Sequence, residues 1–166
     1  MRIFGLAALI AVATLSGPAM AQEAEAAGPL VILNTHQTLA HFGTVPVEGA
    51  PRTAWIWTLY RHAQSLGGTS YDASAALTEF DCAGGRTRVL KTEVYHGDSY
   101  LGVDQTPRDW RVPGAQTLGA TNHELMCRPL TAVAWRNTHA NHHAARARAE
   151  VIWGIEYPEA SAPAGD

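Results

Sequence analysis

Residues 75–95 have the sequence AALTEFDCAGGRTRVLKTEVY, the stretch on which the fold depends most. Its first part alternates along the chain, as a half-buried strand does. Alternation places Ala76, Thr78, Phe80 and Cys82 on one face and Glu79 and Asp81 on the other. Residues 83–85 (AGG) are a turn signal, and residues 86–95 alternate again. The stretch therefore predicts two antiparallel strands joined by a tight turn.

Further strands are predicted on both sides of this pair. Residues 53–61 (TAWIWTLYR) are apolar on both faces, which is typical of a central strand or of one covered on both sides. Shorter strands are predicted over residues 29–35, 99–103 and 130–135, and the chain near Trp110 reads as a strand end closed by a Pro-Gly turn. Residues 36–52 contain Pro46, Gly49 and Pro51, and predict no strand. The order of strands and turns favours an antiparallel meander.

Two helices complete the prediction. Residues 121–127 form a short helix in which Thr121 and Glu124 have capping-box spacing, and this helix would carry Cys127 beneath Cys82. Residues 141–153, rich in alanine and arginine, form a longer helix. The fold class is α+β: a small antiparallel sheet backed by a helix and stapled by one disulfide.

The N-terminal residues have the features of an export signal. Arg2 precedes the mostly apolar run Ile3–Leu15, and Ala19-Met20-Ala21 is the small-x-small pattern of a cleavage site. A membrane span needs about 20 apolar residues, more than this run offers. We expect a signal peptide over residues 1–21, cleaved after Ala21, and no membrane span. A flexible leader (22–28), a sheet domain (29–137), a C-terminal helical extension (138–157) and a disordered tail (158–166) follow.

Charge and composition exclude some partners. Cleavage leaves 145 of the 166 residues, and it removes one of the 12 basic residues and none of the 15 acidic ones. A mildly acidic chain without a run of lysine or arginine argues against nucleic acid and anionic membrane surfaces as partners. The expected location is the periplasm or the medium outside the cell.

The two cysteines, Cys82 and Cys127, are both in the mature chain. In an oxidising compartment an even number favours a disulfide. Redox pairs are usually Cys-x-x-Cys, whereas these cysteines lie 45 positions apart, and two thiolates are too few to close a zinc site. The sequence therefore predicts a structural bridge. The residue directly after the expected cleavage site is Gln22 rather than a cysteine, so lipidation is not expected.

The only obvious metal candidates are histidines. His139, His142 and His143 are spaced i, i+3 and i+4, so on a helix they would share a face and could bind Zn, Cu or Ni. The alternative is a solvated helix face beside Arg146 and Arg148, whose charge opposes a cation.

Signals for catalysis are missing from the sequence. It has no Gly-x-Ser-x-Gly elbow and no phosphate-binding glycine loop. Glu79 and Asp81 are expected to lie on a solvated sheet face. We therefore predict no enzyme activity and no cofactor; an unrecognised hydrolase is the weakest alternative.

Tryptophans are the remaining signal. Trp55, Trp57 and Trp110 fall on predicted strands, where aromatic residues usually belong to the core. A ligand-stacking platform and a dimer interface on an exposed apolar face are the functional alternatives.

Several of these motifs together resemble the surface-adhesin protein E-like family of bacterial exported proteins, over residues 54–128. The resemblance rests on WIWTLY (55–60), FDCAGGRTR (80–88), WRVPG (110–114) and HELMC (123–127). It implies a small antiparallel sheet backed by a helix, with Cys82 bridged to Cys127. The named adhesins are lipid-anchored, bind host matrix proteins and sometimes dimerise.

The leading hypothesis is therefore a non-catalytic exported binding domain. Its partner would be a protein of the cell envelope or the extracellular matrix, or a small ligand, and a homodimer is possible. The alternative function is periplasmic metal binding by His139, His142 and His143.

Overall fold

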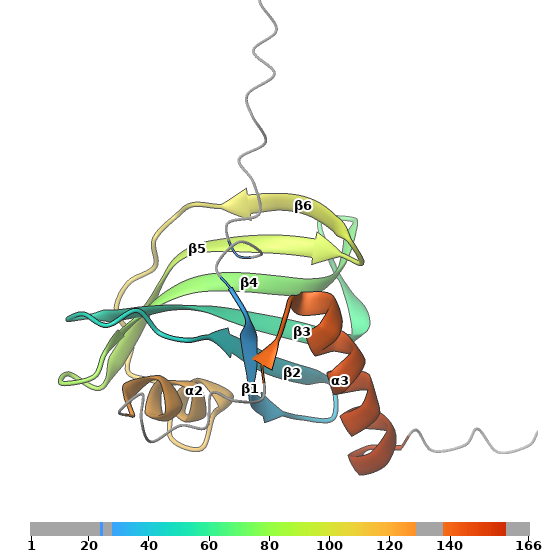
Figure 1. Cartoon of the computed structure of the whole chain (residues 1–166). Coiled ribbons are helices and arrows are strands. Elements are labelled where there is room, and N and C mark those ends of the chain that lie inside the picture. The colour runs from blue at the N-terminus through green and yellow to red at the C-terminus, as the bar shows by residue number, and fades with distance from the viewer. Residues whose placement is uncertain (1–23, 25–27, 129–137, 159–166) are drawn as a thin grey trace, which may run out of the picture.

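The computed structural model describes residue 24, residues 28–128 and residues 138–158 (Figure 1). One seven-stranded antiparallel sheet has the order β6-β5-β4-β3-β2-β1-β7. In chain order the elements are β1 (Leu30–Thr35), β2 (Leu39–Thr44), β3 (Arg52–Leu66), β4 (Thr69–Asp81), β5 (Arg86–His96), β6 (Ser99–Asp104), α2 (Leu118–Cys127), β7 (Thr138–His139) and α3 (His142–Glu156). The predicted α+β class is confirmed.

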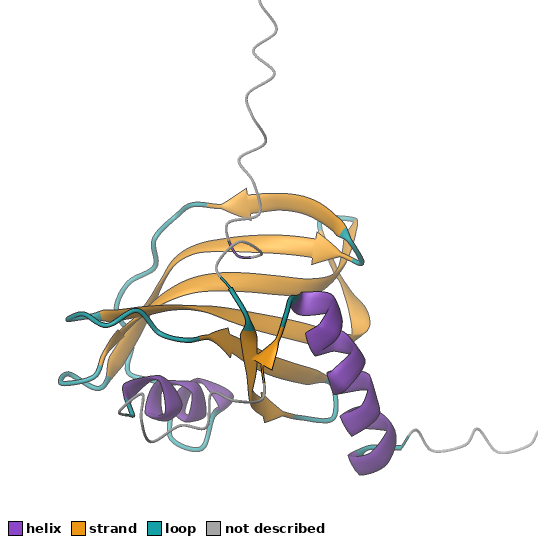
Figure 2. Ribbon diagram, viewed as in Figure 1, coloured by secondary structure: helices purple, strands orange, loops and turns teal. Residues whose placement is uncertain are grey.

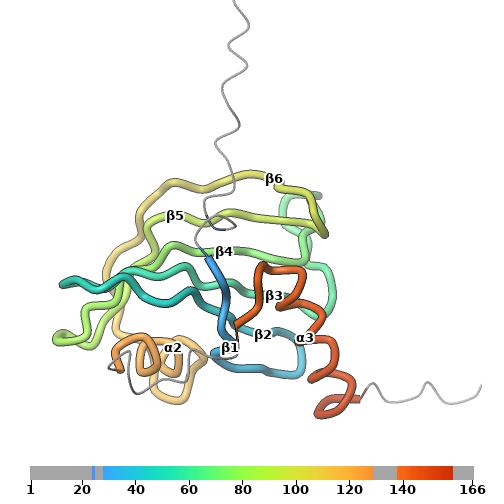
Figure 3. Tube along the Cα trace, viewed as in Figure 1, coloured from blue at the N-terminus to red at the C-terminus, as the bar shows by residue number. Residues whose placement is uncertain are grey.

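The first six strands follow one another in the sheet, so the predicted meander is confirmed. Strand β2 was not predicted, and neither were the ends of β3 and β4 that meet at the Gly67-Gly68 turn. The strand predicted over residues 130–135 lies outside the described residues. The next described segment of the chain contains β7, which pairs with β1 through His139 and Leu30. The trace in Figure 3 shows that the sheet curls, with β1 crossing in front of β3.

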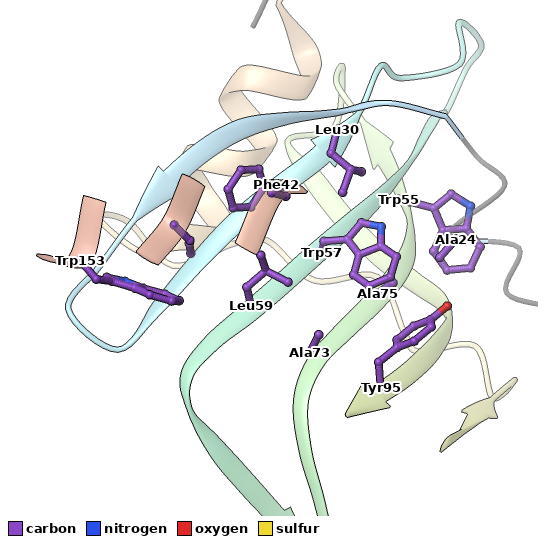
Figure 4. Close-up of a cluster of buried hydrophobic side chains, with 13 residues drawn as sticks. Ala24, Leu30, Phe42, Trp55, Trp57, Leu59, Ala73, Ala75, Tyr95 and Trp153 are labelled. Carbon is purple, nitrogen blue, oxygen red and sulfur yellow. The ribbon is translucent and has the colours of Figure 1, made fainter. Parts of the chain in front are cut away.

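The inner cluster fills the space between the curled sheet and α3 (Figure 4). Its buried members are Ala24, Leu30, Ala40, Phe42, Trp55, Trp57, Leu59, Ala73, Ala75, Tyr95, Ala145, Ala149 and Trp153. Trp57 is fully buried, and its ring centroid lies 4.9 Å from that of Tyr95. The His142 ring stacks on Trp57 with a centroid separation of 4.7 Å and an interplanar angle of 9°, and its centroid lies 5.4 Å from that of Tyr95. Aromatic contacts of this kind stabilise beyond the area they bury.

The second cluster, here the α2 cluster, lies on the opposite face of the sheet. Its buried residues are Ala54, Ile56, Phe80 and Met126. Helix α2 approaches the sheet closely, because a Cβ added at Gly43 would lie 2.5 Å from the Met126 Cε atom. Strand β3 is thus covered on both sides, as its sequence predicts.

Helix α2 is fixed at both ends. Its N-cap is Thr117, whose hydroxyl accepts a hydrogen bond from the Ala120 N–H at 3.2 Å. The predicted capping box at Thr121 is therefore wrong: the N-cap lies four residues earlier, at Thr117, and Glu124 pairs with Arg128 instead. At the other end, Cys127 is bonded to Cys82, so the predicted disulfide is confirmed.

Helix α3 covers the inner cluster, away from α2 (Figure 2). Asn141 caps it by accepting a hydrogen bond from the Ala144 N–H at 3.0 Å. The Trp153 indole donates to the His36 carbonyl at 2.9 Å, and Arg146 donates to the Asp72 carbonyl at 2.6 Å. The residues of α3 therefore share one core with the sheet. Across the part of the chain that the structure describes, no helix has the length and apolarity needed to cross a membrane.

A polar chain crosses the edge of the α2 cluster. The Asn34 amide donates to the Asn122 side-chain oxygen at 2.7 Å, and the Asn122 amide donates to His41 Nδ1 at 2.8 Å. Burial lowers the pKa of His41 below its usual 6.5. His41 is therefore held in its neutral form.

Removal of the disulfide should destabilise the protein strongly. The bridge joins residues 45 positions apart, and the chain-entropy model assigns a closed loop of that size about 4 kcal/mol. We expect the Cys82→Ser/Cys127→Ser double variant to lose about that much free energy of unfolding, measured by urea denaturation. Two thiols titrating in the denatured, unreduced wild type would contradict the bridge itself.

His41 should make stability depend on pH. Because its pKa is lowered in the folded protein, the unfolded chain binds the proton more readily. Its contribution is complete above about pH 6.5 and is lost as the pH falls below that value. We expect unfolding curves of His41→Gln to show a smaller loss of stability over this range than the wild type. If the free energy of unfolding fell equally steeply with pH in the two proteins, His41 would not be the group responsible.

Candidate functional site

The three histidines predicted to share a helix face do not do so. His139 belongs to β7, where its ring meets Phe42 edge-on at 5.5 Å, and α3 begins only after the Asn141 cap. Burial and the charge of Arg148 lower the pKa of His139. The helix-face geometry behind the metal-binding hypothesis is therefore wrong.

The other two imidazole rings lie against each other, with centroids 3.8 Å apart, but their nitrogens have different partners. His142 is buried against Trp57, and its Nε2 lies 3.2 Å from the Gly97 carbonyl oxygen. His143 is half-exposed and its Nδ1 lies 3.1 Å from Asp98 Oδ1. No group of three or more His, Cys, Asp or Glu side chains within the described ranges is arranged to hold a metal ion.

The tryptophans divide into core and surface residues. Trp55 and Trp57 are buried in the inner cluster, as the core interpretation predicts. Lys91 places its Nζ 5.2 Å from the Trp55 ring centroid and covers its outer side. Neither ring is available as a stacking platform. Trp110 is only half-buried and lies at the end of the sheet.

Trp110 is positioned by a segment that continues alongside β5 after β6 ends. The Arg108 N–H donates to the Val89 carbonyl at 2.8 Å, and Thr87 and Arg111 exchange two backbone hydrogen bonds of 2.8 Å. This pairing sets Trp110 beside the first residues of β5. The sequence places Trp110 at a strand end but does not indicate which strand that segment joins.

Two arginines of β5 lie over the Trp110 ring. The Arg86 and Arg88 Cζ atoms are 5.2 Å and 4.7 Å from the ring centroid, within the range of a cation–π interaction. The Arg86 Nε donates to Asp81 at 2.8 Å, and the Arg88 Nε donates to Glu79. We call these five side chains the arginine–tryptophan cluster.

The expectation that Glu79 and Asp81 are merely solvated is wrong. Their side chains are only 14% and 25% exposed, and both are ion-paired across the β4–β5 ladder. The reason is their register: Glu79 lies opposite Arg88, and Asp81 opposite Arg86. Alternation in the sequence predicts which sheet face each carboxylate lies on. The arginines beside the carboxylates are known only from the pairing of β4 with β5.

The β4–β5 turn holds Asp81 rigidly. Its Oδ1 accepts a hydrogen bond from the Gly84 N–H at 2.8 Å. This hydrogen bond and then that from Arg86 hold the pKa of Asp81 below its usual value. A Cβ at Gly84 would lie 2.4 Å from the Asp81 carboxylate, so only glycine leaves room for this arrangement.

An open cleft of about 500 Å³ lies next to the cluster. Ala50 and Pro51 contribute apolar lining, and Arg86 and Trp110 line another part. Arg52 closes the cleft towards α2, where it donates to the carbonyls of Met126 and Arg128 at 2.9 Å and 2.7 Å. Hydrogen-bond donors, an aromatic ring and an adjacent apolar hollow are the chemistry of recognition.

Comparison with known proteins identifies the family. The family model described as surface-adhesin protein E matches residues 33–128, more than half of the chain. Both cysteines and the whole arginine–tryptophan cluster lie within the match, so the resemblance inferred from the motifs is confirmed. The curated proteins and the solved structures that were compared contain no match. The chain belongs to the surface-adhesin protein E family.

Proposed function

We propose that the mature chain is an exported, non-catalytic binding protein that contacts a protein of the cell envelope or the extracellular matrix through the arginine–tryptophan cluster. The observation that carries this proposal is the half-buried Trp110 ring, held by Arg86 and Arg88 beside an open cleft. Tryptophan and arginine are among the residues most enriched at interface hot spots.

Export is supported by two independent features. The N-terminal sequence has the charged start, apolar run and cleavage pattern of a signal peptide, and the Cys82–Cys127 bridge is of a kind that persists in oxidising compartments. Membership of a family named for surface adhesins agrees with both. We place the mature protein in the periplasm or outside the cell, beginning at Gln22.

The metal-binding alternative receives no support from the described geometry. The rings of His142 and His143 touch, but their nitrogens lie beside the Gly97 carbonyl and Asp98. His139 packs against Phe42, and the three histidines do not form a ligand set in the described part of the chain. The cleft, by contrast, combines several recognition groups in one place. Binding of a macromolecule is therefore the better supported function.

Export can be checked by mass spectrometry of the protein from fractionated cells. We expect a chain that starts at Gln22 in the periplasm or the medium, with processing insensitive to globomycin. Ala21→Tyr should leave an unprocessed precursor, because signal peptidase requires a small residue before the cut. A full-length chain in the cytoplasm, or a precursor that accumulates with globomycin, would contradict this proposal.

Binding can be checked by capture from envelope extracts and from extracellular matrix proteins. Trp110→Leu keeps an apolar side chain but removes the ring beneath two guanidinium groups, so we expect capture to fall by about tenfold. Val112→Ala is the matched control, since Val112 is 74% exposed in the same segment. A partner captured equally by wild type and Trp110→Leu, with both folded by thermal melting, would show that the cluster is not the binding surface.

A further inference from the structure

Arg86 and Arg88 are fixed in a way that leaves their hydrogen-bonding ends open. Each guanidinium uses its Nε–H on a carboxylate and its flat face on the Trp110 ring. An arginine carries five N–H donors in a planar fork. Within the described parts of the chain, the terminal amino groups of these two side chains have no protein acceptor.

The open ends face solvent. The Arg86 and Arg88 side chains are 50% and 36% exposed, whereas their carboxylate partners are mostly covered. A ligand thus meets the donors before it meets the acids. Such preorganised forks match the two oxygens of a carboxylate or phosphate and lose little conformational entropy on binding.

The charges around the cluster decide between these ligands. Asp81 and Glu79 neutralise Arg86 and Arg88, and Arg108 in the neighbouring segment pairs with Asp104. The surface therefore lacks the summed positive field that attracts polyanions over long distances. Recognition must come from short-range hydrogen-bond geometry, which suits single carboxylates better than a polyphosphate or a sulfated polysaccharide.

The cleft adds a second requirement. Ala50 and Pro51 offer apolar surface within the same hollow that Arg86 lines. Glu48 and Asp81 also line it and would repel a long acidic run. The occupant that fits both parts is a short peptide segment with a carboxylate side chain next to an apolar one.

From these features we infer that the arginine–tryptophan cluster binds an acidic segment of a partner protein, with its side-chain carboxylates on the forks of Arg86 and Arg88 and a neighbouring apolar side chain in the cleft. This inference rests on the proposed function, because it names the chemistry that the same site recognises.

Fluorescence anisotropy with a labelled peptide of alternating glutamate and phenylalanine tests the inference on the mature, disulfide-bonded protein. The counterpart peptide with glutamine in place of glutamate should bind about tenfold more weakly or not at all. Arg86→Lys/Arg88→Lys keeps both charges, but each lysine ammonium would be taken up by Asp81 or Glu79 and present no fork. We expect this variant to bind the acidic peptide about tenfold more weakly.

Arg108→Lys is the matched control, because Arg108 is an exposed, ion-paired arginine of the adjacent segment, and it should bind like the wild type. Equal binding of the glutamate and glutamine peptides, or full binding by the double lysine variant, would overturn the inference. So would displacement of the peptide by inorganic phosphate at concentrations where free glutamate has no effect. If these tests fail while capture of a partner still depends on Trp110, the proposed function stands and only the acidic ligand is wrong.

Discussion

The whole structure depends on the burial of both faces of β3. Trp55, Trp57 and Leu59 project from one face and Ala54 and Ile56 from the other, and all five are buried. A strand of this kind needs a covering layer on each side. Helix α2 supplies one layer, while α3 and the curled edge of the sheet supply the other. The family match ends at residue 128, so α3 covers β3 with residues that lie beyond it.

The sequence predicted the secondary structure of those segments whose own side-chain pattern determines it. Strands β3, β4 and β5 alternate or are apolar throughout, and their registers follow from short connections. Strand β2 was not predicted because two of its residues are determined by contacts with α2 and do not fit a strand pattern. His41 bonds Asn122 there, and Gly43 makes room for Met126. A histidine and a glycine weaken a strand signal, and their partners are 81 or more positions away in sequence.

The same distinction applies to the candidate sites. Helical spacing of His139, His142 and His143 suggested a shared face, but spacing has that meaning only if one helix runs through all three. Asn141 lies between them, and asparagine is a favoured N-cap, so the helix starts after it. The role of Trp110 in the candidate site could not be predicted from the sequence, because it depends on contacts distant along the chain. Its ring contacts come from a different strand, and no local pattern shows that residues 105–111 would continue the edge of β5.

The β4–β5 hairpin contributes to both the fold and the candidate site, and it uses different side chains for each. Cys82 ties the turn to α2, and Phe80 fills the α2 cluster. The intervening Asp81 points to the opposite face, where it fixes Arg86, because neighbouring strand residues alternate sides. The disulfide thus fixes the position of the turn, while the polar residues of the turn determine which side chains it exposes to solvent. Rigid anchoring by one set of side chains is what allows the other set to hold two guanidinium groups over a single indole ring.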